Sequence, residues 1–282
     1  MDRRTFLRRG AAALGAGMLG SGAYAWGIEP RWVEVVQRDM PIVALPAHWQ
    51  GRRLVQLSDI HVGPGVGDGY LTGALREVAT LQPDLLVITG DLVTFGDPGA
   101  TPRLRALLRQ LPHGRVGTVA VLGNHDYGRG WKRGSSAMEV TRVLRDAGVD
   151  VLRNDVRDVD GLLITGLDDL WSGRMDVTRA IGPVRGAPAV ALCHNPDGAD
   201  APGWDGFTGW ILAGHTHGGQ CRPPFLPAPL LPVRNRRYAA GEVPLADGRR
   251  LYVNRGLGHV LPVRFNVRPE ITSFTLRRAG HA

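Results

Sequence analysis

The sequence predicts an α/β fold from three observations. Short apolar runs alternate with helical patterns, polar side chains follow directly after the apolar runs, and 282 residues are enough for one large domain with a substantial core. Of these residues, 43% are hydrophobic and 21% are charged. This composition is typical of a soluble globular protein and argues against intrinsic disorder and against a polytopic membrane protein.

Residues 1–25 predict an export signal. The segment Asp2-Arg3-Arg4-Thr5-Phe6-Leu7-Arg8 resembles the twin-arginine signal S/T-R-R-x-F-L-K and departs from it only at the first position. A weakly apolar stretch follows, and Ala23-Tyr24-Ala25 supplies the small residues that signal peptidase requires. We expect a cleaved twin-arginine-type signal peptide over 1–25, with an uncleaved N-terminal anchor or a plain buried helix as alternatives.

The signal predicts export by the twin-arginine machinery to the periplasm or the cell envelope. An uncleaved leader would leave the protein associated with the membrane. The formal net charge of +8 is consistent with peripheral association with an anionic envelope surface. Because the arginines are scattered, with no run of five or more, we expect no specific nucleic-acid partner.

Short strands recur along the mature chain, residues 26–282. Two short strands are expected at 32–36 and 42–45, joined by a polar turn. Five nearly continuous apolar runs come next, as expected of strands covered on both faces. These runs are residues 54–58, 85–89, 119–122, 190–193 and 210–213.

Three helical patterns separate the early runs. Leu71, Leu75, Val78 and Leu81 share one helical face that ends before Pro83, and a second leucine face over 104–111 ends before Pro112. The third pattern covers 138–147, with the serines at 135 and 136 as candidate N-caps. This alternation predicts parallel strands joined by short helical crossovers.

The C-terminal part predicts late strands at 251–254 and 271–276 and an irregular proline-rich loop at 223–232. Two cysteines cannot build a disulfide framework, and we expect Cys193 to be a small buried residue. No linker divides residues 26–282, so one domain is expected.

Each apolar run leads into a polar cluster at its carboxyl end. In open α/β sheets ligands bind beyond the carboxyl ends of the strands, so the clusters should converge on one pocket. Their carboxylates, imidazoles and amide oxygen suit Mn²⁺, Zn²⁺ or Fe²⁺. The clusters are Ser58-Asp59-Ile60-His61, Gly90-Asp91, Gly123-Asn124-His125-Asp126, His194-Asn195 and Gly214-His215-Thr216-His217.

The order D-x-H, G-D, G-N-H-D/E, a lone H and G-H-x-H resembles the calcineurin-like metallophosphoesterase superfamily. The match runs from Asp59 to His217, and the segments 218–220, 254–258 and 268–270 resemble its exported bacterial phosphodiesterase branch. The resemblance implies two mixed β-sheets packed together and flanked by helices, in four αββα layers.

The resemblance also implies two divalent metal ions, Mn²⁺, Zn²⁺ or Fe²⁺, and a role for each motif residue. His125 would supply a proton or a cation to the leaving group, and Asp126 would hold the tautomer and orientation of His125. The remaining roles are Asp59, His61 and His217 on the first metal, Asn124, His194 and His215 on the second, and Asp91 as the bridge.

His215 and His217 would point to opposite faces of a regular strand, because they lie two residues apart. Both reach the metals only if the backbone turns, which the glycines at 214, 218 and 219 permit. The other histidines fit no motif element and are expected to be structural or at the surface, with the loop of His259 approaching the pocket: His48, His113, His259 and His281. Purple acid phosphatases carry a tyrosine where Thr94 stands here, so an iron–tyrosinate site is disfavoured.

The resemblance implies an exported dinuclear phosphoesterase that hydrolyses phosphodiester bonds by in-line attack of a metal-bridging hydroxide. Its substrate would be a phosphate-ester small molecule or an envelope component, selected by the loops 127–134, 168–173 and 222–237. One alternative is a UDP-2,3-diacylglucosamine pyrophosphatase, which export disfavours because nucleotide-activated lipid precursors are cytoplasmic. The other is a catalytically idle module that binds anionic envelope polymers, which the complete ligand set disfavours.

Overall fold

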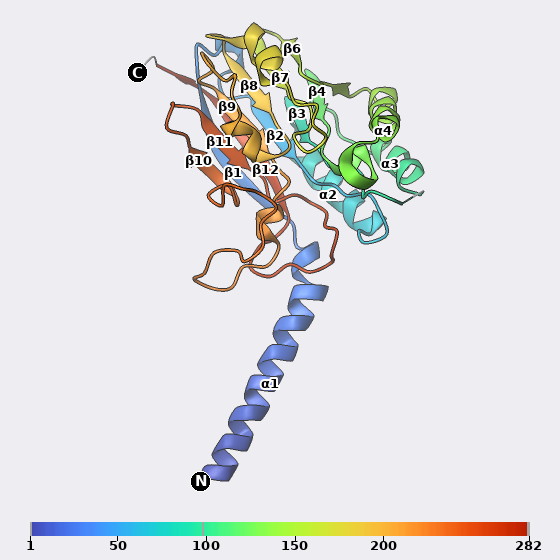
Figure 1. Ribbon diagram of the computed structural model, residues 1–282, viewed down its shortest axis with the longest axis vertical. Coiled ribbons are helices and arrows are strands. Elements are labelled where there is room, and N and C mark those ends of the chain that lie inside the picture. The colour runs from blue at the N-terminus through green and yellow to red at the C-terminus, as the bar shows by residue number, and fades with distance from the viewer. Residues whose placement is uncertain (1, 98, 281–282) are drawn as a thin grey trace.

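The computed structural model describes residues 2–97 and 99–280. Helix α1 (Arg3–Gly27) projects from a domain of two sheets (Figure 1). Among the described residues, no helix combines the length and the apolar character needed to cross a membrane. The predicted cleavage point lies inside α1, where Ala25 is buried and its carbonyl oxygen accepts a hydrogen bond from the Arg264 backbone N–H at 2.9 Å. Cleavage of the signal peptide after residue 25 stays a prediction.

The first sheet has six strands, in the order β1-β12-β2-β3-β4-β5. Strands β2, β3 and β4 are parallel, as the sequence predicts, and β5, which the sequence did not predict, pairs in parallel with β4. Strand β12 joins the sheet antiparallel to β2 and parallel to β1. The strands are β1 (Glu34–Val43), β2 (Arg53–Leu57), β3 (Leu85–Thr89), β4 (Gly117–Val121), β5 (Asp150–Val151) and β12 (Glu270–Ala279).

The second sheet also has six strands, in the order β10-β11-β9-β8-β7-β6. Its four inner strands are parallel and its two edge strands are antiparallel. Both sheets are therefore mixed, as predicted. The strands are β6 (Asp155–Val159), β7 (Leu162–Gly166), β8 (Ala189–Leu192), β9 (Trp210–Ala213), β10 (Gly241–Pro244) and β11 (Arg250–Val253).

Helices cover the outer faces of the two sheets. Apolar side chains of α2 (Asp68–Thr80), α3 (Ala100–Leu108) and α4 (Gly134–Asp146) pack on the first sheet, and α5 (Val177–Ile181) packs on the second. A third buried cluster, which includes Trp210 and Phe274, fills the space between the sheets. The predicted four-layer αββα arrangement is confirmed. Short 3₁₀ helices lie in the connections: η1 (Glu29–Arg31), η2 (Ala47–Trp49), η3 (His125–Tyr127), η4 (Arg129–Trp131), η5 (Gly182–Val184), η6 (Pro196–Asp200) and η7 (His217–Gly219).

Two local predictions are wrong, and one hairpin was not predicted. The strands expected at 32–36 and 42–45 are one strand, β1, because its polar middle residues keep pairing with β12 along the edge of the sheet. The serines at 135 and 136 lie inside the first turn of α4, whose N-cap is the extended residue Arg133. The hairpin β6–β7 was not expected from the sequence. Cys193 is buried as predicted, and both Cys193 and Cys221 are free thiols.

Candidate metal centre

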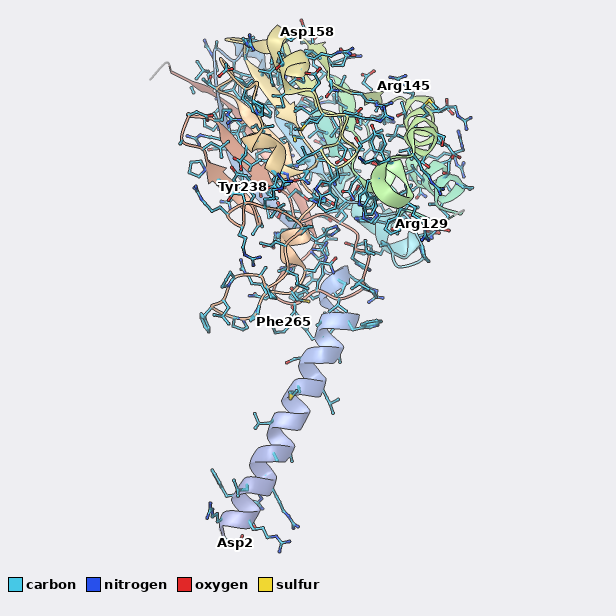
Figure 2. All side chains as sticks on the ribbon, viewed as in Figure 1. Asp2, Arg129, Arg145, Asp158, Tyr238 and Phe265 are labelled. Atoms are coloured by element: carbon cyan, nitrogen blue, oxygen red, sulfur yellow. The ribbon has the colours of Figure 1, made fainter. Side chains whose placement is uncertain are left out.

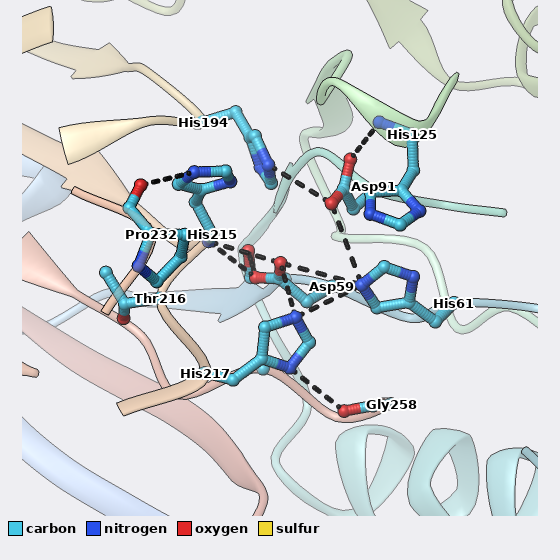
Figure 3. Close-up of polar contacts among 12 residues, drawn as sticks. Asp59, His61, Asp91, His125, His194, His215, Thr216, His217, Pro232 and Gly258 are labelled. Carbon is cyan, nitrogen blue, oxygen red and sulfur yellow. Dashed lines mark hydrogen bonds and ion pairs between the residues drawn. The ribbon is translucent and has the colours of Figure 1, made fainter. Parts of the chain in front are cut away.

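Seven polar side chains from both sheets meet in one buried cluster, six of which Figure 3 labels. They are the side chains that the sequence predicts as metal ligands, and each follows the carboxyl end of a strand. Asp59 and His61 follow β2, Asp91 follows β3, Asn124 follows β4, His194 follows β8, and His215 and His217 follow β9.

Buried hydrogen bonds join the carboxyl ends of the two sheets. The Gln56 amide on β2 donates to Thr89 Oγ1 on β3 at 3.0 Å and to the Ala213 carbonyl oxygen on β9 at 2.9 Å. The Asp59 carboxylate accepts a hydrogen bond from the His215 backbone N–H at 3.0 Å. These bonds place the loop after β9 directly against the loop after β2.

Asp59, His61 and His217 form the first group of candidate ligands. His217 Nε2 lies 3.3 Å from Asp59 Oδ1 and 3.1 Å from His61 Nε2. One donor atom from each of the three residues lies within 4.8 Å of the other two. The three donors therefore surround a space suited to one cation.

Asp91, His194 and His215 form the second group under the same distance limit. His194 Nε2 lies 3.3 Å from Asp91 Oδ2 and 3.2 Å from Asn124 Oδ1. Asp91 Oδ2 also lies 3.6 Å from His61 Nε2, so this carboxylate stands between the two groups. The structure brings all seven predicted side chains together, and their role as ligands stays a prediction.

Backbone carbonyl oxygens fix three of the imidazoles from outside the cluster, and Figure 3 shows the contacts of His215 and His217. Thr89 O accepts from His194 Nδ1 at 2.7 Å, Pro232 O lies 3.0 Å from His215 Nε2, and Gly258 O lies 3.2 Å from His217 Nδ1. A carbonyl oxygen only accepts, so each outer nitrogen carries a proton and the inner nitrogen of each ring is turned toward the cluster, where a metal could bind it.

The backbone is strained at five of the seven positions. Asp59, His61, Asp91, His215 and His217 all have φ between 49° and 70°, a left-handed conformation that non-glycine residues rarely adopt. Such strain persists only where surrounding structure enforces it and is concentrated at functional sites. The turn that the sequence required between the last two histidines is made by these residues themselves.

Two glycines allow the backbone to approach the carboxylates. A Cβ on Gly123 would lie 2.2 Å from Asp91 Oδ1, and one on Gly256 would lie 2.6 Å from Asp59 Cβ. Gly256 also has a φ of 70°. Any larger residue at either position would displace the carboxylate beside it.

Burial and charge set the protonation of the cluster. Burial lowers the pKa of His61 and of His215 to about 3, so both imidazoles are neutral and able to bind a metal. Burial also opposes the charged form of His194, but the Asp91 carboxylate outweighs it and raises the pKa of His194 to about 10, so a metal ion would have to displace the proton on its inner nitrogen. The neighbouring histidines hold the pKa of Asp91 well below its usual range despite burial, so this carboxylate is ionised.

His125 lies at the edge of the cluster, as expected of a group that would meet the substrate. Its backbone N–H donates to Asp91 Oδ1 at 2.8 Å, and its ring centroid lies 4.6 Å from that of His61. Its Nδ1 is buried and has no hydrogen-bond partner among the described residues. This nitrogen is therefore available to a ligand.

The role predicted for Asp126 is wrong. Its carboxylate accepts hydrogen bonds from the backbone N–H groups of Leu92, Val93 and Gly123, at 2.9 to 3.2 Å, and none from the His125 ring. Burial and the charge of Asp91 raise the pKa of Asp126 to about 8. Asp126 ties the loop after β3 to the loop after β4, and it is a structural residue rather than the orienting partner of His125.

An aromatic wall that the sequence does not reveal closes one side of the cluster. Trp131 packs against His125 with ring centroids 4.7 Å apart, and Trp171 packs against His215 at 4.5 Å. The two tryptophan rings lie 6.3 Å apart, so the wall runs from one histidine to the other. These tryptophans lie on two of the loops expected to set selectivity.

Arg264 is a second feature without a sequence signal. Its guanidinium is fully buried and donates to the carbonyl oxygens of Arg255, Gly256 and Gly258 at 2.7 to 3.1 Å. Burial lowers the pKa of Arg264 to about 10, which leaves it charged near neutral pH. Arg264 therefore clamps the loop whose Gly258 carbonyl fixes His217.

Three of the other histidines, His48, His113 and His259, lie outside the cluster. His48 contacts Asp160 O and His113 contacts Thr118 Oγ1, in keeping with structural roles. His259 is buried with Nε2 3.1 Å from Gly65 O, and it belongs to neither ligand group. His281 lies outside the described residues. Thr94 sits beside His61, and its hydroxyl donates to the His61 carbonyl oxygen at 3.3 Å.

Comparison with known proteins identifies relatives along almost the whole chain. Residues 52–219 match the family model of the calcineurin-like phosphoesterases. The metallophosphoesterase YkuE of Bacillus subtilis is 32% identical over 98% of both chains, and the phosphodiesterase YaeI of Escherichia coli is 31% identical over 98% of this chain and 99% of its own. The UDP-2,3-diacylglucosamine pyrophosphatase LpxG of Chlamydia trachomatis is 28% identical over 86% of this chain and 89% of its own.

Proposed function

Since the chain belongs to the calcineurin-like phosphoesterase family of metal-dependent phosphoric ester hydrolases, we propose that it is an exported phosphodiesterase with two divalent ions in the buried cluster. The observation that carries the proposal is the position of Asp91 between two groups of nitrogen and oxygen donors. One carboxylate shared by two groups is the arrangement that a dinuclear centre requires.

The donor set fits divalent ions of intermediate hardness. It contains four imidazoles, two carboxylates and one amide oxygen, and no thiolate. Such ligands suit Mn²⁺, Zn²⁺ or Fe²⁺. Asp59, His61 and His217 would hold one ion, Asn124, His194 and His215 the other, and Asp91 would bind both. When bound, the ions supply Lewis acidity, which lowers the pKa of a coordinated water and offsets charge on the phosphoryl oxygens.

The protein's own residues would orient the metal ligands and supply a proton to the leaving group. The carbonyl bonds to His194, His215 and His217 keep the ligands in place before substrate binds. The free Nδ1 of His125 is the group available to protonate or stabilise the leaving alkoxide. Trp131 and Trp171 flank the cluster beside His125 and His215, where they could contact a bound substrate.

Room for a second ester group supports a diester substrate. A cavity of about 700 Å³ is lined by Trp171 and Pro232 together with Arg234, Asp197 and Asp200, and none of the seven predicted ligands lines it. Pro232 is the residue whose carbonyl contacts His215, so the cavity adjoins the second ligand group.

A UDP-2,3-diacylglucosamine pyrophosphatase is the second candidate. The similarity to LpxG over 86% of this chain favours it. The twin-arginine-like segment at residues 2–8 disfavours it, because such a substrate is cytoplasmic. The proposed site of action is the periplasm or the cell envelope, reached through the twin-arginine machinery.

The decisive assay uses bis(p-nitrophenyl) phosphate with the metal-free protein and after addition of Mn²⁺. We expect turnover only after metal addition, with the monoester p-nitrophenyl phosphate cleaved more slowly. Faster cleavage of UDP-2,3-diacylglucosamine than of the diester would favour the second candidate. Tight metal binding without turnover of any of the three compounds would contradict both and favour a binding module.

A further inference from the structure

Exposed apolar side chains are concentrated at the end of the domain from which α1 projects. This apolar end consists of Trp26, Ile28, Phe225, Leu226, Leu230, Val260 and Leu261. Phe225 is fully exposed, and Leu230 and Leu261 are 80% and 68% exposed. Apart from Val43, Met138 and Trp171, every large hydrophobic side chain that is exposed in the described chain lies on α1 or near this end. Such concentration marks an interaction surface.

Hydrogen bonds hold together the three segments that form the apolar end, although the segments are far apart in the sequence. The Arg222 N–H donates to Phe265 O, and the Arg264 N–H donates to Ala25 O. The buried Glu29 carboxylate accepts from the backbone N–H groups of Asn266 and Val267. Figure 2 shows Phe265 next to the base of α1, where these segments meet. Because the segments are held together, their exposed side chains form a fixed surface.

The charge of this surface is one-sided. The loops 222–237 and 255–269 contain seven arginines and no acidic residue. Arg222, Arg234, Arg236 and Arg237 are exposed. Exposed apolar side chains surrounded by arginines suit the headgroup region of an anionic bilayer, where the acyl chains lie within a few ångströms of the negatively charged headgroups.

The aromatic residues at the junction with α1 also favour a bilayer over a protein. Phe225, Leu226 and Leu230 are exposed on a proline-rich loop, and Phe225 also borders a cavity of about 500 Å³ beside Tyr24 at the base of α1. Trp26 and Trp32 flank the junction with α1, and tryptophan is enriched at the interface between membrane and water. We propose that the apolar end docks the domain on the surface of an anionic lipid bilayer.

Docking would bring the metal centre close to the lipid surface. Pro232 and Gly258, whose carbonyls contact His215 and His217, belong to the same two loops as Leu230 and Val260. Substrates in or near the bilayer would then be within reach. The docking surface does not depend on the proposed activity, because binding to lipid is measured without turnover.

The test is sedimentation of the full chain with vesicles of phosphatidylglycerol and phosphatidylethanolamine, and with phosphatidylcholine vesicles as the neutral arm. We expect strong binding to the anionic vesicles. Because salt screens the arginine charges, binding should be weaker at roughly 0.5 M salt than at roughly 0.1 M salt. The triple variant Phe225→Ser/Leu226→Ser/Leu230→Ser should bind the vesicles about tenfold or more weakly than the unchanged chain. The pair Val260→Ser/Leu261→Ser should act in the same direction.

Met138→Ser is the matched control, because Met138 is 61% exposed but lies on α4, away from this end (Figure 1). It should bind vesicles like the unchanged chain. If the triple variant and the unchanged chain bound vesicles equally, the proposal would be overturned, because the binding would then come from α1 alone. A concentration-dependent dimer that the triple variant abolishes, without vesicle binding by either protein, would also overturn it in favour of a second copy.

Discussion

His125 is the residue whose surroundings point most directly to proton transfer. Its ring lies against His61, Phe95 and Trp131, and its buried Nδ1 is left for a ligand. Its backbone N–H donates to Asp91 Oδ1, and a ring nitrogen lies within 4.8 Å of a donor atom of Asp91 and of His61. Because those two residues already belong to the proposed ligand groups, we expect the His125 ring to matter for rate far more than for metal content.

We predict that His125→Ala keeps both metal ions but lowers kcat by about 10²- to 10⁴-fold, the usual contribution of general acid–base catalysis. Metal analysis beside steady-state kinetics checks this. His259→Ala is the control, because it removes another buried imidazole outside both ligand groups. An unchanged rate in His125→Ala would remove the proposed role.

Gly256 tests whether close packing positions Asp59. We predict that Gly256→Ala destabilises the fold by about 1–3 kcal/mol and weakens Mn²⁺ binding by about tenfold, because the new methyl group would collide with Asp59. Gly248→Ala is the control, since Gly248 has a φ of 89° but open space around it. Thermal unfolding and calorimetric titration separate the two effects. Equal Mn²⁺ affinity in both variants would show that packing against Asp59 is unimportant.

At the scale of the elements, the loop 255–258 depends on a buried arginine. Arg264→Met should cost about 2–4 kcal/mol of unfolding free energy, because it leaves the carbonyl oxygens of the loop buried and unpaired. Arg277→Met is the control, because its ion pair with Asp39 is exposed and worth little. Denaturant unfolding of both variants measures the difference, and similar losses would contradict the role of the clamp.

The sequence predicts the parallel core and the cluster because both depend on local signals. Continuous apolar runs identify β2, β3, β4, β8 and β9, and the polar residue after each run identifies the pocket. Because parallel strands end at the same edge of a sheet, the residues that directly follow them lie close together.

Features that depend on tertiary contacts escape this reasoning. β1 is continuous only because β12, more than 200 residues later, pairs with its polar middle. Trp131 and Trp171 approach the cluster from loops whose path no periodicity specifies. The Asp126 carboxylate accepts hydrogen bonds from backbone amides of a neighbouring loop, and a sequence motif does not show contacts between loops.

At the scale of the whole molecule, bound metal should stabilise the domain. The cluster joins both sheets, so unfolding of either sheet destroys it. Ligands that bind only the folded state add about 2.7 kcal/mol at a hundredfold excess over Kd. We predict that removal of metal by a chelator lowers Tm by roughly 5–10 °C and that Mn²⁺ restores it. An unchanged Tm in calorimetry would show that the cluster binds no metal tightly.

The central claim is that the carboxylate of Asp91 joins two metal ions. The most direct measurement is an anomalous difference map from crystals loaded with Mn²⁺. It should contain two peaks roughly 3.5–4 Å apart, one beside Asp59 and His217 and one beside His194 and His215, with Asp91 between them. A single peak, or two peaks of which Asp91 touches neither, would contradict the account.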